Sequence, residues 1–142
     1  MSLLKICGLT RIADLRLALR LGADYVGAIV DIPRSPRSLD WGHAAALLRA
    51  AEGQGVAVVE KADVETVTRI AKEARLAAVQ PHEAMNVESM AALREALPEG
   101  TEVWPVLGMA QIPNMQGAIV ADLIETARYY ADCGADKIVL DS

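Results

Sequence analysis

The stretch of sequence that decides the fold is residues 21–26, which read LGADYV, and it recurs at residues 133–138 as CGADKI. In each copy the glycine can adopt the left-handed conformation that ends a helix. The aspartate favours a tight turn, and β-branched residues of strand character follow it. The two copies begin 112 residues apart, so four intervening strand–helix units would average about 28 residues each. This spacing predicts a parallel sheet with right-handed crossovers.

Short apolar runs and longer amphipathic segments alternate along the whole chain. The apolar runs predict six strands, at residues 3–6, 25–30, 56–59, 77–80, 103–107 and 137–141. The amphipathic segments predict five helices, at residues 12–21, 41–51, 64–74, 87–97 and 118–132. Thr10, Asp40 and Asp63 stand where side chains cap helices, and Gly22 should end the first helix.

A closed barrel of eight such units takes roughly 220–250 residues. We therefore expect an α/β fold with a parallel sheet of the (β/α) TIM-barrel type. The barrel would be incomplete, with about six strands and five helices of eight. Residues 1–142 would form a single, partial βα domain.

Composition excludes several classes of function. The chain has 142 residues, of which 53% are hydrophobic and 4% aromatic, and its net charge is −5. An acidic, aromatic-poor protein is a poor partner for nucleic acid. No apolar run approaches the roughly 20 residues of a membrane span, and the N-terminus does not resemble a signal peptide. Cys7 and Cys133 lack metal-ligand spacing, so we expect reduced thiols in a cytoplasmic protein.

Two reactive side chains end predicted strands. Cys7 follows the first strand and Asp141 ends the last. Catalytic groups of parallel α/β folds gather at the carboxyl ends of the strands, so these two residues are candidates for a base and an acid. Two simpler interpretations stay open: a cysteine there can be a small buried apolar residue, and an aspartate can be a turn residue.

Several motifs in register along the chain resemble the phosphoribosylanthranilate isomerase family of tryptophan biosynthesis. They are KICGLT at 5–10, GAD and VG within 22–27, PRSPR at 33–37, AVQ with a histidine at 78–82, and LDS at 140–142. The resemblance implies an Amadori rearrangement, in which an N-glycosidic aminoaldose becomes a 1-amino-1-deoxyketose. It implies Cys7 as general base, Asp141 as general acid and Arg37 as the residue that binds the anthranilate carboxylate.

The resemblance also implies substrate contacts for Gln80 and His82, and no cofactor. His82 could equally cap the following helix, and Arg37 could be a solvated loop charge. A free thiol titrates near 8.5 and a free aspartic acid near 3.9, so at neutral pH a base and an acid would need these pKa values shifted toward each other. Lys5, Arg34 and Arg37 are the cations that could lower the pKa of the thiol.

The family's phosphate site lies in glycine-rich loops after its last two strands, and the resemblance ends before them. We therefore expect a barrel that lacks its C-terminal part, with its first and last strands unpaired. Such edges favour association, so we predict a homodimer that binds a small phosphorylated substrate. The alternative function is a non-enzymatic or repurposed βα module that binds a ligand or subunit through its open sheet edge.

Overall fold

The computed structural model describes residues 2–60, 63–108 and 119–141. Its strands are β1 (Lys5–Ile6), β2 (Tyr25–Val30), β3 (Ser38–Leu39), β4 (Gly55–Val59), β5 (Ala78–Pro81), β6 (Glu102–Val103), β7 (Val106–Gly108) and β8 (Val139–Asp141). Its helices are α1 (Ile12–Arg20), α2 (Trp41–Arg49), α3 (Val64–Ala74), α4 (Val87–Ala96) and α5 (Ile119–Asp132). The alternation of strands and helices is as predicted, except that the short strand β3 was not predicted. The expected helix start at Ala118, and Ser142 of the last motif, lie outside the described residues.

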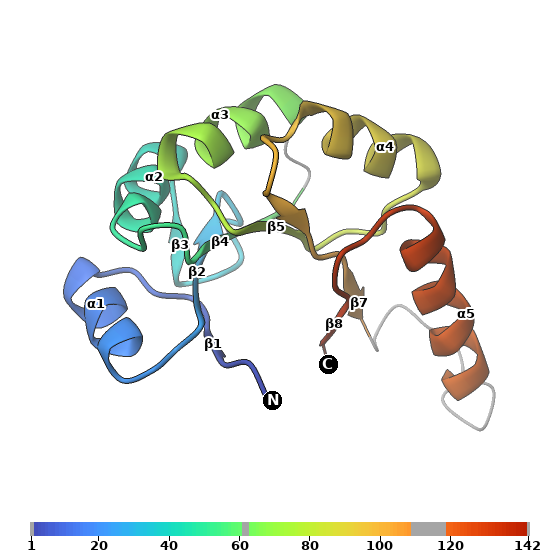
Figure 1. Cartoon of the computed structure of the whole chain (residues 1–142), viewed down its shortest axis with the longest axis horizontal. Coiled ribbons are helices and arrows are strands. Elements are labelled where there is room, and N and C mark those ends of the chain that lie inside the picture. The colour runs from blue at the N-terminus through green and yellow to red at the C-terminus, as the bar shows by residue number, and fades with distance from the viewer. Residues whose placement is uncertain (1, 61–62, 109–118, 142) are drawn as a thin grey trace.

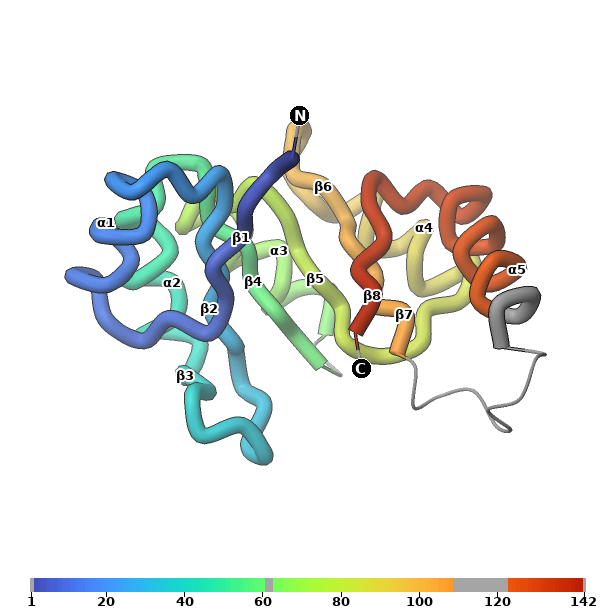
Figure 2. Tube along the Cα trace, turned by 90° about the horizontal axis from the view of Figure 1, so that it is seen from below, coloured from blue at the N-terminus to red at the C-terminus, as the bar shows by residue number. Residues whose placement is uncertain are grey.

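All strand pairs are parallel. The main sheet has the order β1-β2-β4-β5-β6, with β3 beside β2, and a second small sheet pairs β7 with β8. The strands form an arc with the helices around its outside (Figure 1). Within the described residues, β1 pairs only with β2 and β8 only with β7. The two edge strands border one opening (Figure 2), so the predicted incomplete barrel is confirmed.

The predicted fifth strand, at 103–107, is divided in the structure, and Pro105 explains the division. Trp104, the residue before it, still donates its backbone N–H to the carbonyl of Val79 in β5 at 2.9 Å. Proline has no N–H, so the ladder with β5 stops at the next residue. After Pro105 the chain pairs with a different strand. The backbone N–H of Val139 donates to the Pro105 carbonyl at 3.0 Å, and β7 pairs with β8.

The two glycine–alanine–aspartate turns have the same hydrogen bonds. The carboxylate of Asp24 accepts from the backbone N–H of Leu4 at 2.7 Å, and that of Asp136 accepts from the N–H of Val103 at 2.8 Å. Both glycines have positive φ, as predicted: 96° at Gly22 and 93° at Gly134. The prediction that the aspartate holds its own turn was wrong. Its carboxylate instead binds the neighbouring strand, because that strand's end presents an unpaired N–H.

Helix caps were predicted correctly in two cases of three. Asp40 accepts from the backbone N–H of His43 at 2.9 Å, and Asp63 accepts from that of Thr66 at 2.8 Å. Thr10 does not cap α1, whose N-cap is Arg11 without a side-chain hydrogen bond. The helix begins at Ile12, as predicted, so residue 11 occupies the capping position and Thr10 lies one residue before it.

Two apolar clusters lie on opposite faces of the sheet. The larger one joins the outer face of the strands to the helices, and it includes Leu15, Val26, Leu48, Val79 and Met90. The smaller one consists of Val56, Ala78 and Trp104, with Tyr25 and Val139 against it. The small cluster therefore lines part of the inner face of the arc, on the side of the sheet away from the helices. In the part of the chain that the structure describes, no helix is long and apolar enough to cross a membrane.

A polar group closes the amino-terminal end of this lining. Glu102 Oε2 accepts from Trp104 Nε1 at 2.5 Å and from the ammonium of Lys137. Lys137 Nζ also lies 4.8 Å from the centre of the Trp104 ring, in a cation–π arrangement. Burial raises the pKa of Glu102, but the hydrogen bonds from Lys137 and Trp104 outweigh it and hold that pKa below its ordinary value.

Because the folded pKa of Glu102 is lowered, its carboxylate contributes stability above the unfolded pKa of roughly 4.3. That contribution is lost as the pH falls through the lower folded value. We predict that Glu102→Gln lowers the melting temperature at pH 7 and that the difference from the parent shrinks steadily toward pH 3. Thermal unfolding of both proteins across this range is the measurement. A difference independent of pH would contradict the assigned role.

Candidate active site

The predicted site residues lie at the carboxyl ends of parallel strands. Cys7 follows β1 directly, His82 follows β5, and Asp141 is the last residue of β8. Arg37 belongs to the loop between β2 and β3. Because all of these strands are parallel, their carboxyl ends share one edge of the sheet. The structure thus brings the predicted residues to the same end of the arc.

The thiol of Cys7 lies against the backbone of β2. A methyl group built on Gly27 would lie 2.9 Å from Cys7 Sγ, which is closer than carbon and sulfur normally approach. The loop after the thiol is tied to the same residue, since Leu9 donates its backbone N–H to the Gly27 carbonyl at 3.0 Å. Cys7 as a whole is half-buried.

The guanidinium of Arg37 lies next to the backbone that carries the thiol. A methyl group built on Gly8 would lie 2.9 Å from Arg37 Cζ and Nη1. Gly8 also has a φ of 75°, a conformation that side-chain-bearing residues rarely adopt. Glycine is therefore required here for its conformation, and its lack of a side chain lets the guanidinium of Arg37 lie against it. The consequence is an exposed cation one residue from Cys7.

Lys5 and Gln80 meet across the inner face of the sheet. The Lys5 ammonium donates to Gln80 Oε1, although β2 and β4 lie between their strands in the sheet order. Gln80 is buried, with 6% of its surface exposed. Side chains alternate along a strand, so Lys5 and Cys7 belong to the same face of β1. The contact therefore holds the Gln80 side chain on the inner face that also carries Cys7. The Lys5 ammonium has the amide oxygen of Gln80 as its partner.

His82 and Asp141 form a second pair on the other side of the opening. Nε2 of His82 lies 3.0 Å from Oδ2 of Asp141, and the two side chains are 30% and 52% exposed. The helix α4 is capped by Asn86, whose side chain accepts from the N–H of Ser89 at 2.8 Å. The alternative in which His82 caps that helix is therefore wrong.

Arg34 has a different environment from Arg37. Its Nη1 lies 2.7 and 2.6 Å from the two carboxylate oxygens of Glu60, which follows β4. One nitrogen of the guanidinium thus contacts both oxygens of a carboxylate, so the charge of Arg34 is paired with that of Glu60. The expectation that Arg34 could act as a cation for the thiol is therefore not supported, and Arg37 is the loop arginine that lies against Gly8, the residue after Cys7.

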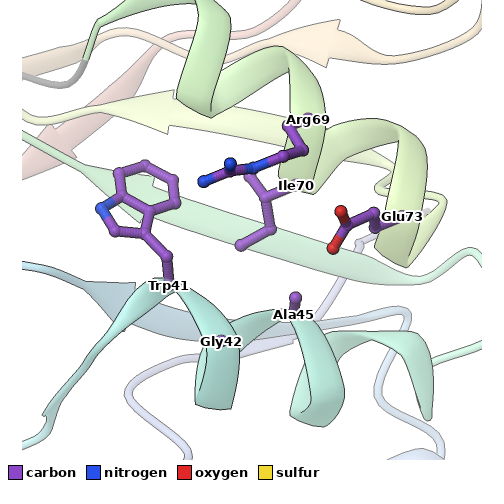
Figure 3. Close-up of a pocket in the computed structure, with 6 residues that line it drawn as sticks. All are labelled: Trp41, Gly42, Ala45, Arg69, Ile70 and Glu73. Carbon is purple, nitrogen blue, oxygen red and sulfur yellow. The ribbon is translucent and has the colours of Figure 1, made fainter.

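Two further features of the described structure lie outside this set of residues. Among the residues described, no group of three or more histidine, cysteine or acidic side chains could hold a metal ion. A hollow of about 200 Å³ lies between α2 and α3 (Figure 3). It is lined by Trp41, Gly42, Ala45, Arg69, Ile70 and Glu73. These helices cover the outer face of the sheet, so this hollow is separate from the strand ends.

The fold and the site define a class before any relative is considered: a parallel α/β protein of the barrel type, with a thiol, a guanidinium, an imidazole and a carboxylate at its strand ends. Residues 4–135 match the family described as N-(5'-phosphoribosyl)anthranilate (PRA) isomerase. The chain belongs to this family.

Individual relatives agree with the assignment. The N-(5'-phosphoribosyl)anthranilate isomerase of Afipia carboxidovorans is 37% identical over 145 residues, which span all of this chain and 56% of that protein. The solved phosphoribosyl anthranilate isomerase of Thermococcus kodakaraensis is 25% identical with a TM-score of 0.82, covering 100% of this chain and 65% of that one. A third isomerase, solved with reduced 1-(o-carboxyphenylamino)-1-deoxyribulose 5-phosphate, is 26% identical with a TM-score of 0.76, covering 99% and 65%.

The chain thus spans a little over half the length of the Afipia carboxidovorans isomerase. The motifs located Cys7, Arg37, Gln80, His82 and Asp141, but they did not identify the residues that make room for two of them. Gly8 and Gly27 were quoted only as parts of motifs. A glycine inside an apolar strand is a signal of close backbone approach, and Gly27 carries that signal.

Proposed function

We propose that this chain carries the catalytic groups of a phosphoribosylanthranilate isomerase, which converts N-(5-phosphoribosyl)anthranilate to the corresponding 1-deoxyribulose phosphate. The observation that carries the proposal is the family match over residues 4–135, joined to the placement of Cys7 and Asp141 at the ends of β1 and β8. The solved relative with a carboxyphenylamino deoxyribulose phosphate supports a ligand of this chemistry.

The reaction needs one proton donor and one proton acceptor. Asp141 would protonate the ribose ring oxygen, so that the ring C1–O bond breaks and a protonated Schiff base forms between C1 and the anthranilate nitrogen. Cys7, as thiolate, would then take the proton from C2, and the electron pair of that C–H bond neutralises the iminium. The resulting enolamine becomes the ketone when a proton is added at C1 and the hydroxyl on C2 gives up its proton, so that the thiolate and the carboxylic acid are both regenerated. Each of these steps is a proton transfer or a bond shift within the substrate, so the proposed route uses no cofactor.

The other residues would bind and orient. Arg37 would form a charge-assisted pair with the anthranilate carboxylate next to Cys7. His82 would hold Asp141 through the 3.0 Å contact, so that one proton is available between Nε2 and Oδ2. Gln80 would orient the substrate, with its amide oxygen fixed by Lys5.

The alternative function, a non-enzymatic module, is less well supported. It accounts for the open edge of the sheet but gives no reason for a thiol, a guanidinium and a carboxylate at the strand ends.

We propose further that residues 1–142 act as one domain, that the substrate is a small phosphorylated molecule and that the enzyme works in the cytoplasm. The main core cluster extends from Leu15 to Tyr130, which supports the single domain.

The acid–base pair is tested by removing each group. We predict that Cys7→Ala and Asp141→Asn each lower kcat by about 10²–10⁴-fold, since an alanine cannot accept the C2 proton and an amide cannot donate to the ring oxygen. Formation of the ketose, followed by chromatography, is the measurement, with circular dichroism as the control for folding. Cys133→Ala is the matched control, because Cys133 follows α5 and packs against the core. Variants with turnover within a few-fold of the parent would contradict the roles, and a parent without turnover would contradict the function.

Arg37 is tested separately. We predict that Arg37→Ala weakens substrate binding by about 1.5–3 kcal/mol, the usual contribution of a hydrogen bond to a charged group. Arg34→Ala is the control from the same loop, since its guanidinium already binds Glu60, and its apparent affinity should stay within a few-fold of the parent. Equal effects of the two substitutions would return Arg37 to the interpretation as a solvated loop charge.

We also propose that the chain associates as a homodimer through its open edge. Large apolar side chains are exposed on β1, on α1 and on the segments that flank them: Leu3, Leu4, Ile6, Ile12, Leu17 and Leu21. A groove of about 360 Å³ runs between β1 and α1. On the other side of the opening, Leu140 of β8 is 68% exposed. Covering this surface gains roughly 25 cal/mol for each Å² of apolar area and pairs both strand edges.

Sedimentation equilibrium at micromolar concentration tests the dimer. We predict a dimeric parent, and a shift toward monomer in Leu21→Glu, which places a charge in the groove. Val87→Glu is the control: Val87 is 55% exposed, but it lies on α4, away from β1. A monomeric parent, or equal loss of association in both variants, would contradict an interface at this edge.

A further inference from the structure

Gly27 occupies a position in β2 where its backbone conformation does not require glycine. It lies in the interior of the strand, is buried, and pairs in register with Val56 of β4. Its φ is not among the positive values of the described residues, unlike that of Gly8. Glycine weakens the interior of a strand because it has no side chain to pack and loses more chain entropy than other residues. A different constraint must therefore account for it.

That constraint is space. Side chains alternate along β2, so Tyr25, Gly27 and Ile29 share the inner face, and Gly27 leaves a gap between two large residues. Cys7 fills the gap. A methyl group built on Gly27 would lie 2.9 Å from Cys7 Sγ, but at 3.5 and 3.6 Å from Cα and Cβ of the same residue. The conflict is thus confined to the sulfur atom, and the remaining contacts are ordinary.

We infer that Gly27 is a positioning residue for the Cys7 thiol. By carrying no side chain, it leaves the space that Sγ occupies at the carboxyl end of β1, and its carbonyl holds the following loop through Leu9. The catalytic meaning of this position rests on the proposed function, in which the thiolate must reach the proton on C2. The steric relation between the two residues does not depend on that function.

Any side chain at position 27 would move the thiol. Sulfur needs to withdraw by several tenths of an ångström from a new methyl group, either by rotation about the Cα–Cβ bond or by a shift of β1. Proton abstraction depends steeply on the distance and alignment of the base, and a misplacement of about 1 Å can cost 10²-fold in rate. Substrate binding by Arg37 should change much less, because its guanidinium lies against Gly8.

Gly27→Ala is the test. We expect kcat to fall by about 10–100-fold while KM stays within threefold, which separates displacement of the base from general loss of structure. The matched control is Gly55→Ala, the same substitution in the adjacent strand β4. A methyl group there would lie 3.2 Å from the Leu48 carbonyl oxygen and 3.3 Å from Leu48 Cδ2, away from the thiol. We expect it to lower stability without lowering the kcat of the folded protein.

A double-mutant cycle with Cys7→Ala measures the steric relation without activity. Because removal of Sγ leaves only the ordinary contacts, Gly27→Ala should lower the melting temperature by less than half as much in the Cys7→Ala protein as in the parent. Gly55→Ala should lower it equally in both.

If Gly27→Ala prevents folding of the parent, folding in the Cys7→Ala protein supports the inference, and unfolding in both overturns it. Equal effects of Gly27→Ala in the two proteins, or an unchanged kcat, also overturn it. Coupling in a chain without turnover would instead identify a failure of the proposed function.

Discussion

The hydrogen bonds of two aspartates with the strands beside them fix the register on which the site depends. Asp24 accepts from the N–H of Leu4 and donates its own backbone N–H to the Leu4 carbonyl at 2.9 Å. Once residue 4 is held against residue 24, Lys5 pairs with Tyr25 and Ile6 with Val26, and Cys7 comes beside Gly27. A slip of one residue would turn the thiol to the opposite face of the sheet.

Asp136 does the same at the other end of the chain. Its backbone N–H donates to the Val103 carbonyl at 3.0 Å while its carboxylate accepts from the Val103 N–H. The offset set there continues through the break at Pro105, so that Val106 pairs with Val139 and Gly108 with Asp141. Arg94 adds a charge to this contact, with Nη1 2.7 Å from Asp136 Oδ2. The same short motif thus occurs twice and sets the strand register of the proposed base in one copy and of the proposed acid in the other.

The sequence predicted the parts of this arrangement that are local. The apolar period located the five helices and every strand except β3, and Asp40 and Asp63 were correct as caps because capping involves residues three apart. The divided strand at Pro105 was missed, although a proline inside a strand was a visible signal of it. The role of Asp24 was misassigned because its acceptor contact joins residues twenty positions apart. Such contacts depend on register, which no single turn contains.

The candidate site shows the same limit. The motifs brought Cys7 and Asp141 to strand ends, but they did not distinguish Arg34 from Arg37 by physical reasoning. These two arginines lie three residues apart in one loop, and only the tertiary structure gives Glu60 to one and the Gly8 backbone to the other. The pair of His82 with Asp141 likewise depends on the curvature of the sheet, because β5 and β8 are not neighbours in it.

The proposed base and acid stand at the ends of strands that border the opening. Cys7 follows β1 and Asp141 ends β8, and within the described residues each of these strands is paired on one side only. Strands held on one side open locally more easily than strands held on both, so the distance between the two groups is less restricted than that of any pair on the inner strands. Whatever covers the opening would therefore act on catalysis directly, since ordering β1 and β8 restricts the base and the acid at the same time. The apolar edge and the proposed catalytic groups are therefore linked, because a surface that covers the edge also holds Cys7 and Asp141 in a fixed geometry.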